Sequence, residues 1–448
     1  MKRYINKLFW ISPFIAFIPF IVISFFARPA ADDLTPNFYI ARMGLAEMIK
    51  QSYLNVSGRF FSISVFLSLS GSRFILEHYY LVSIGLLSLF LLALYSLTRN
   101  VAAVILGLPL SRGRAASLAF IFLLLYLAVM PDMASSFYWM AAGVTYQLSV
   151  ILVLFLTNSL LQFIIRGKWI YWIISAILSL ALFGCNEIVI FIYIPIFTFT
   201  VLLLFVQSHR SKWPCLFLLL LSVAAALALL FAPAAQARSG MLSHGTGFIY
   251  SISASVTQML IIAIHAFSAP PFWILLILIL LAGRSVTLSS QQQRWLLTYA
   301  QLLLALCFTT CFIVFKIKDN GLPGRANNVI AFAFLASFIL QAVYFGVKYK
   351  DVLTVTSAKL EPAIRLIFMV SLFTSMNYTV ASRDILSGYL FSKVYDKRVS
   401  IIRDAVTSGK HAVVLDDYNM YWNAMVQEHI PVGFQKPVIK LVDHYPPS

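Results

Sequence analysis

Charged residues are scarce in this chain of 448 residues, where they make up 11% of the sequence against 61% for hydrophobic residues. Acidic residues are the scarcest of them, since 16 Asp and Glu stand against 33 Lys and Arg. The mean hydropathy is +0.88, and apolar runs near the roughly 20 residues that cross a bilayer as a helix recur along the chain. This composition excludes a soluble fold and predicts an all-α polytopic membrane protein.

Cysteine and histidine are also few, and neither type is spaced to hold a metal ion. Cys307 and Cys311 share a helix face, yet no His or carboxylate is near them in the sequence, so we interpret them, with Cys185 and Cys215, as thiols packed among apolar side chains. The sequence contains no nucleotide-binding motif, no internal repeat and no low-complexity segment. These absences argue against a nucleotide-sugar donor and against a metal site built from Cys and His.

Eleven membrane-spanning helices follow from a length of about 20 residues per span. The first apolar run lacks a clean cleavage site, so we interpret it as a retained span and not as a signal peptide. Lys and Arg gather in every second connection, which is the positive-inside bias and not a nucleic-acid-binding face. We therefore expect a cytoplasmic N-terminus and, because the span number is odd, an extracytoplasmic C-terminus. The predicted spans are 8–27, 79–97, 115–130, 143–165, 169–184, 188–207, 214–231, 256–282, 295–315, 329–347 and 362–382.

The connections predicted to face outward carry most of the unusual polar residues. The first of these, 28–78, is too long for a turn and has apolar residues at helical spacing, which predicts one or two amphipathic helices in the interface plane. These helices could hold a lipid headgroup, or the loop could be a structural lid. Residues 383–448 differ in composition and contain strand-like segments, which predicts a small extracytoplasmic α/β domain after a transmembrane domain of residues 1–382.

Two adjacent carboxylates, Asp32 and Asp33, follow the first span. A carboxylate at a membrane boundary can accept a proton from a hydroxyl nucleophile, and a pair can hold a divalent cation such as Mg²⁺ or Mn²⁺ against a phosphate. Arg28 is close enough in sequence to pair with one of them. The alternative is structural, because Asp favours helix starts and Asp32 could cap a helix that begins near Pro36.

Further candidates lie in the other outward connections. Glu187, with Asn186 before it, occupies a tight corner where an ionisable group usually has a purpose, although it could be a solvated loop acid. Arginine offers a planar fork of donors that fits phosphate oxygens, but it is also common at span ends. Aromatic residues could stack on a sugar ring or belong to the interfacial belt. These arginines and aromatic residues are Arg59, Arg238, Arg325, Tyr138, Trp139 and Tyr146.

The order of these motifs along the chain is similar to that of a known family. An acidic pair follows the first span, Gly58-Arg59-Phe60 comes later in that loop, and an aromatic corner precedes the fourth span. Asn186-Glu187 follows the fifth span, Pro and then Arg238 the seventh, and Pro323-Gly324-Arg325 the ninth. In this order they resemble the DUF6056 type of bacterial polytopic proteins, which looks like a branch of the GT-C glycosyltransferase superfamily. The resemblance extends from the first span through the last.

The resemblance implies a GT-C-like fold and a sugar donor carried on a polyprenyl phosphate or pyrophosphate. It implies that Asp32 or Asp33 is the essential acid of the first outward loop and that Glu187 is a second acidic or substrate-orienting group. It further implies that the three arginines contact the donor phosphate. The other expected substrate-binding residues are Asn186, Tyr138, Trp139 and Tyr146.

We therefore expect an inverting glycosyltransferase of the bacterial inner membrane that transfers a sugar to an extracytoplasmic surface glycan such as an O-antigen, a capsule or a teichoic-acid-type polymer. A donor-synthesising glycosyltransferase and a flippase would act upstream. A transporter or flippase of lipid-linked sugars is the first alternative, although it would need polar residues near the middle of the spans and usually repeat symmetry. A non-catalytic scaffold for glycan assembly is the second.

Overall fold

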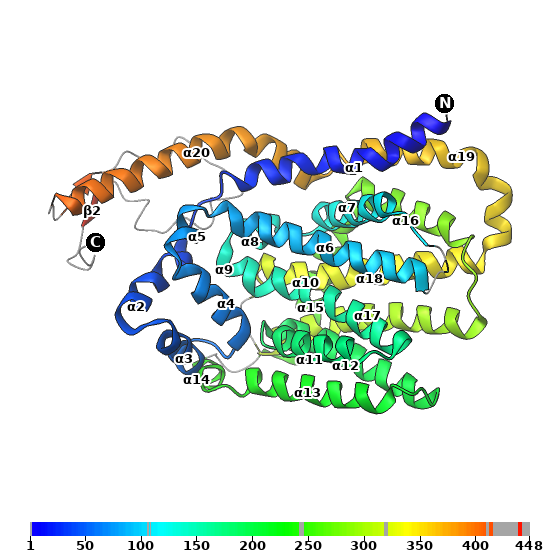
Figure 1. The fold of residues 1–448 in the computed structure, drawn as a ribbon, viewed down its shortest axis with the longest axis horizontal. Coiled ribbons are helices and arrows are strands. Elements are labelled where there is room, and N and C mark those ends of the chain that lie inside the picture. The colour runs from blue at the N-terminus through cyan, green and yellow to red at the C-terminus, as the bar shows by residue number, and fades with distance from the viewer. Residues whose placement is uncertain are drawn as a thin grey trace.

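The protein is a bundle of helices that run roughly side by side (Figure 1). The computed structural model describes residues 2–104, 107, 109–241, 246–317, 321–408, 412–414 and 438–440. Among these residues, ten helices are long and apolar enough to cross a membrane. The prediction of an all-α polytopic membrane protein is therefore confirmed.

The long helices account for most of the chain, and α7 is the most enclosed of them because 61% of its residues are buried. Helices α1, α6, α16 and α20 pack around it. The helices of the bundle are α1 (Lys2–Ser24), α6 (Tyr80–Val104), α7 (Arg112–Val129), α10 (Leu148–Arg166), α11 (Trp169–Phe183), α12 (Glu187–Val206), α13 (Lys212–Leu230), α15 (Phe248–Phe267), α16 (Pro270–Gly283), α17 (Ser290–Ile317), α18 (Gly324–Lys348), α19 (Lys350–Ser371) and α20 (Met376–Thr407).

The predicted spans need three corrections. The span predicted at 256–282 is two helices, α15 and α16, separated before Pro270 and Pro271, because a proline disfavours helical backbone in the residue that precedes it. The span predicted at 362–382 is interrupted by a bend at residues 372–375, between α19 and α20. Helix α11 has 15 residues, about 22 Å at 1.5 Å per residue, which is shorter than the bilayer core.

The loop of residues 28–78 folds at one end of the bundle, which we call the site end (Figure 1). We predicted one or two helices here, and the structure has four helices preceded by a 3₁₀ turn. Helices α2 and α3 contain the apolar repeat on which the prediction rested, whereas α4 is apolar along its length and lies against α3. The elements are η1 (Ala31–Asp33), α2 (Thr35–Met43), α3 (Leu45–Asn55), α4 (Phe60–Ser70) and α5 (Arg73–Glu77).

The remaining short elements also lie towards the site end. They are α8 (Met133–Phe137), α9 (Met140–Ala142), the π-helical turn η2 (Gly143–Gln147) and α14 (Pro233–Met241). Strands β1 (Ala412–Val414) and β2 (Val438–Lys440) pair antiparallel within residues 383–448, where strand-like segments were predicted. Most of the chain after residue 408 lies outside the described residues, and α20 runs unbroken across the boundary predicted at 382/383. The separate C-terminal domain stays a prediction.

Two glycines allow α16 and α18 to approach closely. A Cβ atom added at Gly346 would lie 2.3 Å from the carbonyl oxygen of Leu280 and 3.0 Å from Cα of Gly283. Small residues at such contacts let membrane helices pack backbone to backbone. This contact fixes α18, which begins at the site end with Gly324, against its neighbour.

We predict that Gly346→Ala destabilises the protein by about 1–3 kcal/mol, since the added methyl group must push two backbones apart. Thermal unfolding of the purified protein in detergent measures the effect. Gly85→Ala is the matched control, because a Cβ there meets no atom within 4 Å. Equal melting temperatures for the two variants would contradict the close packing of α16 and α18.

Candidate active site

One short segment, residues 138–147, lies at the centre of the site end, and we call it the corner segment. It contains α9 and η2 and leads directly into α10. It contacts η1 and α4 of the 28–78 loop on one side and α18 on the other. Most of the residues predicted for the site contact this segment or belong to it.

Asp33 joins the 28–78 loop to the corner segment and is completely buried. Its Oδ1 accepts a hydrogen bond from the backbone N–H of Ala141 at 3.0 Å. Its Oδ2 accepts from the Tyr79 hydroxyl at 2.6 Å and from the N–H of Ala30 at 3.1 Å. The Tyr79 hydroxyl in turn accepts from the N–H of Met140 at 2.8 Å. Both carboxylate oxygens are therefore occupied, and Asp33 holds the loop in place.

Burial raises the pKa of Asp33 to about 7, against an ordinary value of 3.8. The three hydrogen bonds from Tyr79, Ala30 and Ala141 act in the opposite direction, because they favour the ionised form, but desolvation outweighs them. The nearby charge of Asp32 adds a small further increase. Asp33 therefore titrates near neutral pH while it is shielded from solvent.

Asp32 differs from its neighbour, since its side chain is exposed. It accepts no hydrogen bond and forms no ion pair with any residue that the structure describes. Arg28, which we considered as a partner, instead forms an ion pair with Asp396 of α20, with two N–O distances of 2.8 Å. Of the two adjacent acids, Asp32 is thus the one whose carboxylate is open to solvent.

Arg59 and Glu187 form an ion pair that links the 28–78 loop to the start of α12. The guanidinium Nη2 lies 2.8 Å from Oε2 of Glu187, and Nε lies 3.1 Å from the same oxygen. The Arg59 guanidinium also lies over the ring of Tyr146, 5.5 Å from its centroid. The two motifs that contain Arg59 and Glu187, which are 128 residues apart in sequence, are therefore partners in space.

Close packing explains the residues on either side of Arg59. A Cβ at Gly58 would lie 2.3 Å from the carbonyl oxygen of Leu229 at the end of α13, so only glycine fits there. A Cβ at Gly184 would lie 2.5 Å from the ring of Phe60. The Gly-Arg-Phe segment is therefore wedged between the ends of α13 and α11, and this position directs Arg59 towards Glu187.

Asn186 caps α12 and ties it to the corner segment. Its side-chain oxygen accepts hydrogen bonds from the N–H groups of Ile188 and Val189. Its amide nitrogen donates to the carbonyl of Thr145 at 2.8 Å and to the hydroxyl of Ser149 at 3.0 Å. The buried amide is fully used in these contacts, which is the structural role expected of an N-cap.

Arg325, at the start of α18, lies over the ring of Trp139, with the guanidinium 4.9 Å from the ring centroid. It forms no ion pair with any carboxylate in the described part of the chain. The same corner segment carries Tyr138, but that side chain is buried and its hydroxyl donates to the carbonyl of Phe20 at 2.9 Å. Tyr138 therefore holds α1 against the corner segment, and Trp139, which is also buried, supports the Arg325 guanidinium.

Asp132 is a site residue that the sequence reasoning missed. Its Oδ1 caps α8 by accepting from the N–H of Ser135 at 3.0 Å. A Cβ at Gly324 would lie 2.8 Å from its Oδ2, which accepts no hydrogen bond from the described residues. The carboxylate is therefore next to the segment that carries Arg325. The sequence did offer a reason to select it, because acidic residues are rare in this chain and Asp132 lies in a predicted outward connection.

Two predictions remain without a structural account. The backbone of Arg238 belongs to α14, which lies beside α3, but its side chain is outside what the structure describes. In the described residues, no group of three or more His, Cys, Asp or Glu could hold a metal ion. The binding of Mg²⁺ or Mn²⁺ by the acid pair stays a prediction.

No protein-family model and no curated protein matches this chain.

We predict that Arg59→Gln and Glu187→Gln each destabilise the protein by about 1.5–3 kcal/mol, since each leaves a half-buried charge without its partner. The double variant should cost less than the sum of the two, because it removes both charges. Thermal unfolding of wild type, the two single variants and the double variant in detergent measures the coupling energy between Arg59 and Glu187. Additive single effects would mean that the ion pair does not hold the loop.

The pH dependence of stability tests the environment of Asp33. Its folded-state pKa is raised, so the folded protein binds more protons than the unfolded chain between about pH 4 and 7, and stability falls as pH rises through that range. We expect wild type to lose about 2–3 kcal/mol between pH 5 and 8 relative to Asp33→Asn, which cannot titrate. Melting temperatures of both proteins across this range measure the difference, and parallel curves would contradict the raised pKa.

Proposed function

We propose that this protein is a membrane glycosyltransferase that transfers a sugar from a polyprenyl-phosphate donor to a cell-surface glycan on the extracytoplasmic face. One observation carries the proposal. At the site end, Arg325, whose guanidinium forms no ion pair with the described residues, lies over Trp139 and follows Gly324, which packs against Asp132. The exposed Asp32 is adjacent to Asp33, which is hydrogen-bonded to the corner segment that carries Trp139. A cation for phosphate, held on a buried aromatic ring, and an exposed carboxylate for a hydroxyl group are components that such a transfer needs.

The distribution of charge supports an extracytoplasmic position for this site. The basic connections 98–114, 166–168, 208–212 and 284–294 each join helices at the end of the bundle opposite the site end. Under the positive-inside rule that opposite end is cytoplasmic. A donor held at the site end would then have its phosphate at the outer surface of the bacterial plasma membrane.

The chemistry assigns a different role to each charged group. Arg325 would stabilise the charge that grows on the departing phosphate oxygen as the bond from that oxygen to the anomeric carbon breaks. Asp32 would accept the proton of the acceptor hydroxyl while its oxygen bonds to the anomeric carbon, and direct attack inverts that carbon. Asp33 is a positioning residue, because its oxygens are occupied by Ala30, Tyr79 and Ala141. Asp132 is a second candidate for the base.

A transporter of lipid-linked sugars remains the alternative from another class. The buried network of Tyr126, Gln147 and Asn328 is the feature that most resembles a polar path between helices. Its hydrogen bonds run to the corner segment at the site end, however, and all three side chains are uncharged. A network that supports one end of the bundle favours an enzyme over a transport pathway.

We predict that Asp32→Asn lowers sugar transfer by about 10²–10⁴-fold, as expected for loss of a general base. Arg325→Gln should lower it by about 10²–10³-fold through loss of charge stabilisation. The measurement is mass spectrometry of surface glycan from cells that carry wild type, a deletion or each variant, read for one sugar mass lost. Asp404→Asn, an exposed acid on α20, is the control.

The outcomes separate the candidate functions. Loss of the sugar in the deletion and in Asp32→Asn, with the protein still folded, supports the transferase. Full transfer by Asp32→Asn together with loss in Asp132→Asn would reassign the base to Asp132. Full transfer by both single variants and by their double variant would overturn the proposal and favour transport or a scaffold.

A further inference from the structure

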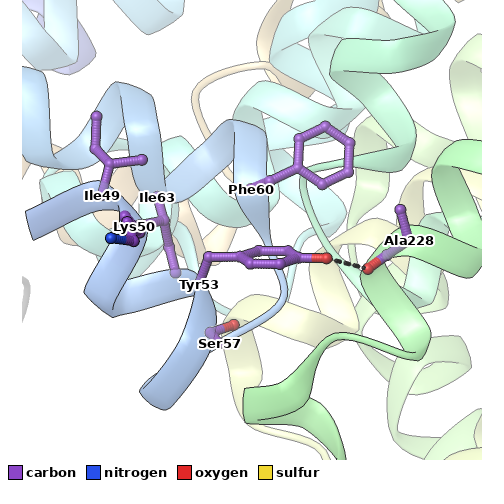
Figure 2. A pocket seen from close by; sticks show the side chains of 7 residues that line it. All are labelled: Ile49, Lys50, Tyr53, Ser57, Phe60, Ile63 and Ala228. Atoms are coloured by element: carbon purple, nitrogen blue, oxygen red, sulfur yellow. Dashed lines mark hydrogen bonds between the residues drawn. The ribbon is translucent and has the colours of Figure 1, made fainter. Parts of the chain in front are cut away.

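A cavity of about 460 Å³ lies beside the site end, between the 28–78 loop and α13. Figure 2 shows its walls, in which Ile49, Lys50 and Tyr53 come from α3, Ile63 from α4 and Ala228 from α13. Phe60 and Ser57 complete the lining. The Tyr53 hydroxyl donates a hydrogen bond to the Ala228 carbonyl at 2.9 Å, so the tyrosine bridges the two walls. A cavity of this size lies within the roughly 300–1,000 Å³ typical of ligand sites.

The cavity adjoins the face of α13 that would contact lipid. Exposed large apolar residues follow one face of this helix at helical spacing, and Ala228 lies in the last turn of the same helix. The largest exposed side chains on this face are Trp213, Phe217, Leu220, Leu227 and Phe231. A hydrocarbon chain could therefore enter the cavity sideways from the bilayer without crossing water.

The lining indicates what kind of molecule would enter. Most of the seven residues present carbon atoms to the cavity, which is open on one side, and burying apolar groups against such a surface is favourable. Lys50 is the one charged residue among the seven. Its side chain is 65% exposed and its Nζ is 3.5 Å from the Glu47 carboxylate, a loose surface pair. An ammonium group above an apolar cavity suits a lipid that has a phosphate next to its chains.

The cavity is separated from the charged groups of the site. Phe60 forms part of its wall and packs against Gly184, whereas Arg59, the preceding residue, points to Glu187. A molecule in the cavity would contact the loop that positions Arg59 without reaching that ion pair. This separation favours a bilayer lipid over the sugar donor.

We propose that this cavity binds one acyl chain of a glycerophospholipid from the adjoining leaflet, with the lipid phosphate at Lys50. The bound chain packs against α3, α4 and α13 together and thereby stabilises the 28–78 loop on the bundle. The proposal does not depend on the proposed glycosyltransferase activity. Phosphatidylglycerol suits the site best, because its net negative charge complements Lys50.

Native mass spectrometry of the full-length protein in detergent, with added phosphatidylglycerol, tests the proposal. Ile63→Trp fills the cavity from α4, and we expect it to retain one phosphatidylglycerol fewer than wild type. Ile173→Trp, on the exposed face of α11, is the matched control and should retain the wild-type number. Lys50→Glu should weaken phosphatidylglycerol binding by about fivefold to tenfold, while Lys168→Glu, outside the cavity, should not.

A second readout excludes misfolding as the cause. Ile63→Trp and Ala228→Leu, which fill the cavity from opposite walls, should keep the wild-type melting temperature without lipid and lose the increase that phosphatidylglycerol gives to wild type. Equal phosphatidylglycerol binding by wild type and both filled variants would overturn the proposal. Displacement of phosphatidylglycerol by undecaprenyl phosphate in wild type, with loss of transfer in the filled variants, would also overturn it and assign the cavity to the donor lipid.

Discussion

The site end depends on how the 28–78 loop covers the open ends of the helices beneath it. Helix ends leave backbone carbonyls and N–H groups without intrahelical partners, and these are costly near a membrane unless something else bonds to them. The start of α4 meets this need for α11, because the N–H of Phe61 donates to the carbonyl of Gly184 and the Ser62 hydroxyl donates to that of Cys185. Once α4 is docked in this way, Arg59 is carried to Glu187, and the loop becomes part of the bundle.

The two adjacent acids illustrate how an environment separates identical side chains. Asp33 accepts hydrogen bonds from its own loop, from Tyr79 and from the corner segment, and it thereby holds these parts together. Its burial raises its pKa. Asp32 turns outward from the same 3₁₀ turn and keeps its carboxylate accessible. Of these two scarce acids, one is therefore buried in the packing of the loop and the other is exposed to solvent.

The two arginines of the site differ in the same manner. Arg59 is neutralised by Glu187 and serves to hold the loop, while Arg325 rests on Trp139 without a described carboxylate partner. The positive charge available to an anionic ligand is therefore on the α18 side of the corner segment. The apolar cavity lies on the α13 side, so the guanidinium that we propose for the donor phosphate and the cavity that we propose for a bilayer lipid are on different sides of the corner segment.

Much of the fold could be predicted from the sequence, because a membrane span is set by the length and hydropathy of a local segment. The errors in the predicted spans were also local. Helices α15 and α16 separate at a proline pair, and the last span bends where α19 ends. A hydropathy average over about 20 residues conceals such breaks. The site was less predictable. Residue type indicated the polar positions but could not distinguish Asp33 from Asp32, since their difference is one of burial.

By itself, the sequence determined that this chain is a bundle of apolar helices, with basic residues in the short connections at one end and most of its rare acids towards the other. Tertiary structure alone decided which of those residues meet. Arg59 pairs with Glu187 because Gly58 and Gly184 allow two backbones and the Phe60 ring to pack closely. Asp132 comes to lie beside Gly324 because α8 and α18 pack together. Such partners are far apart along the chain, and only the packing of the helices fixes the distances on which their chemistry depends.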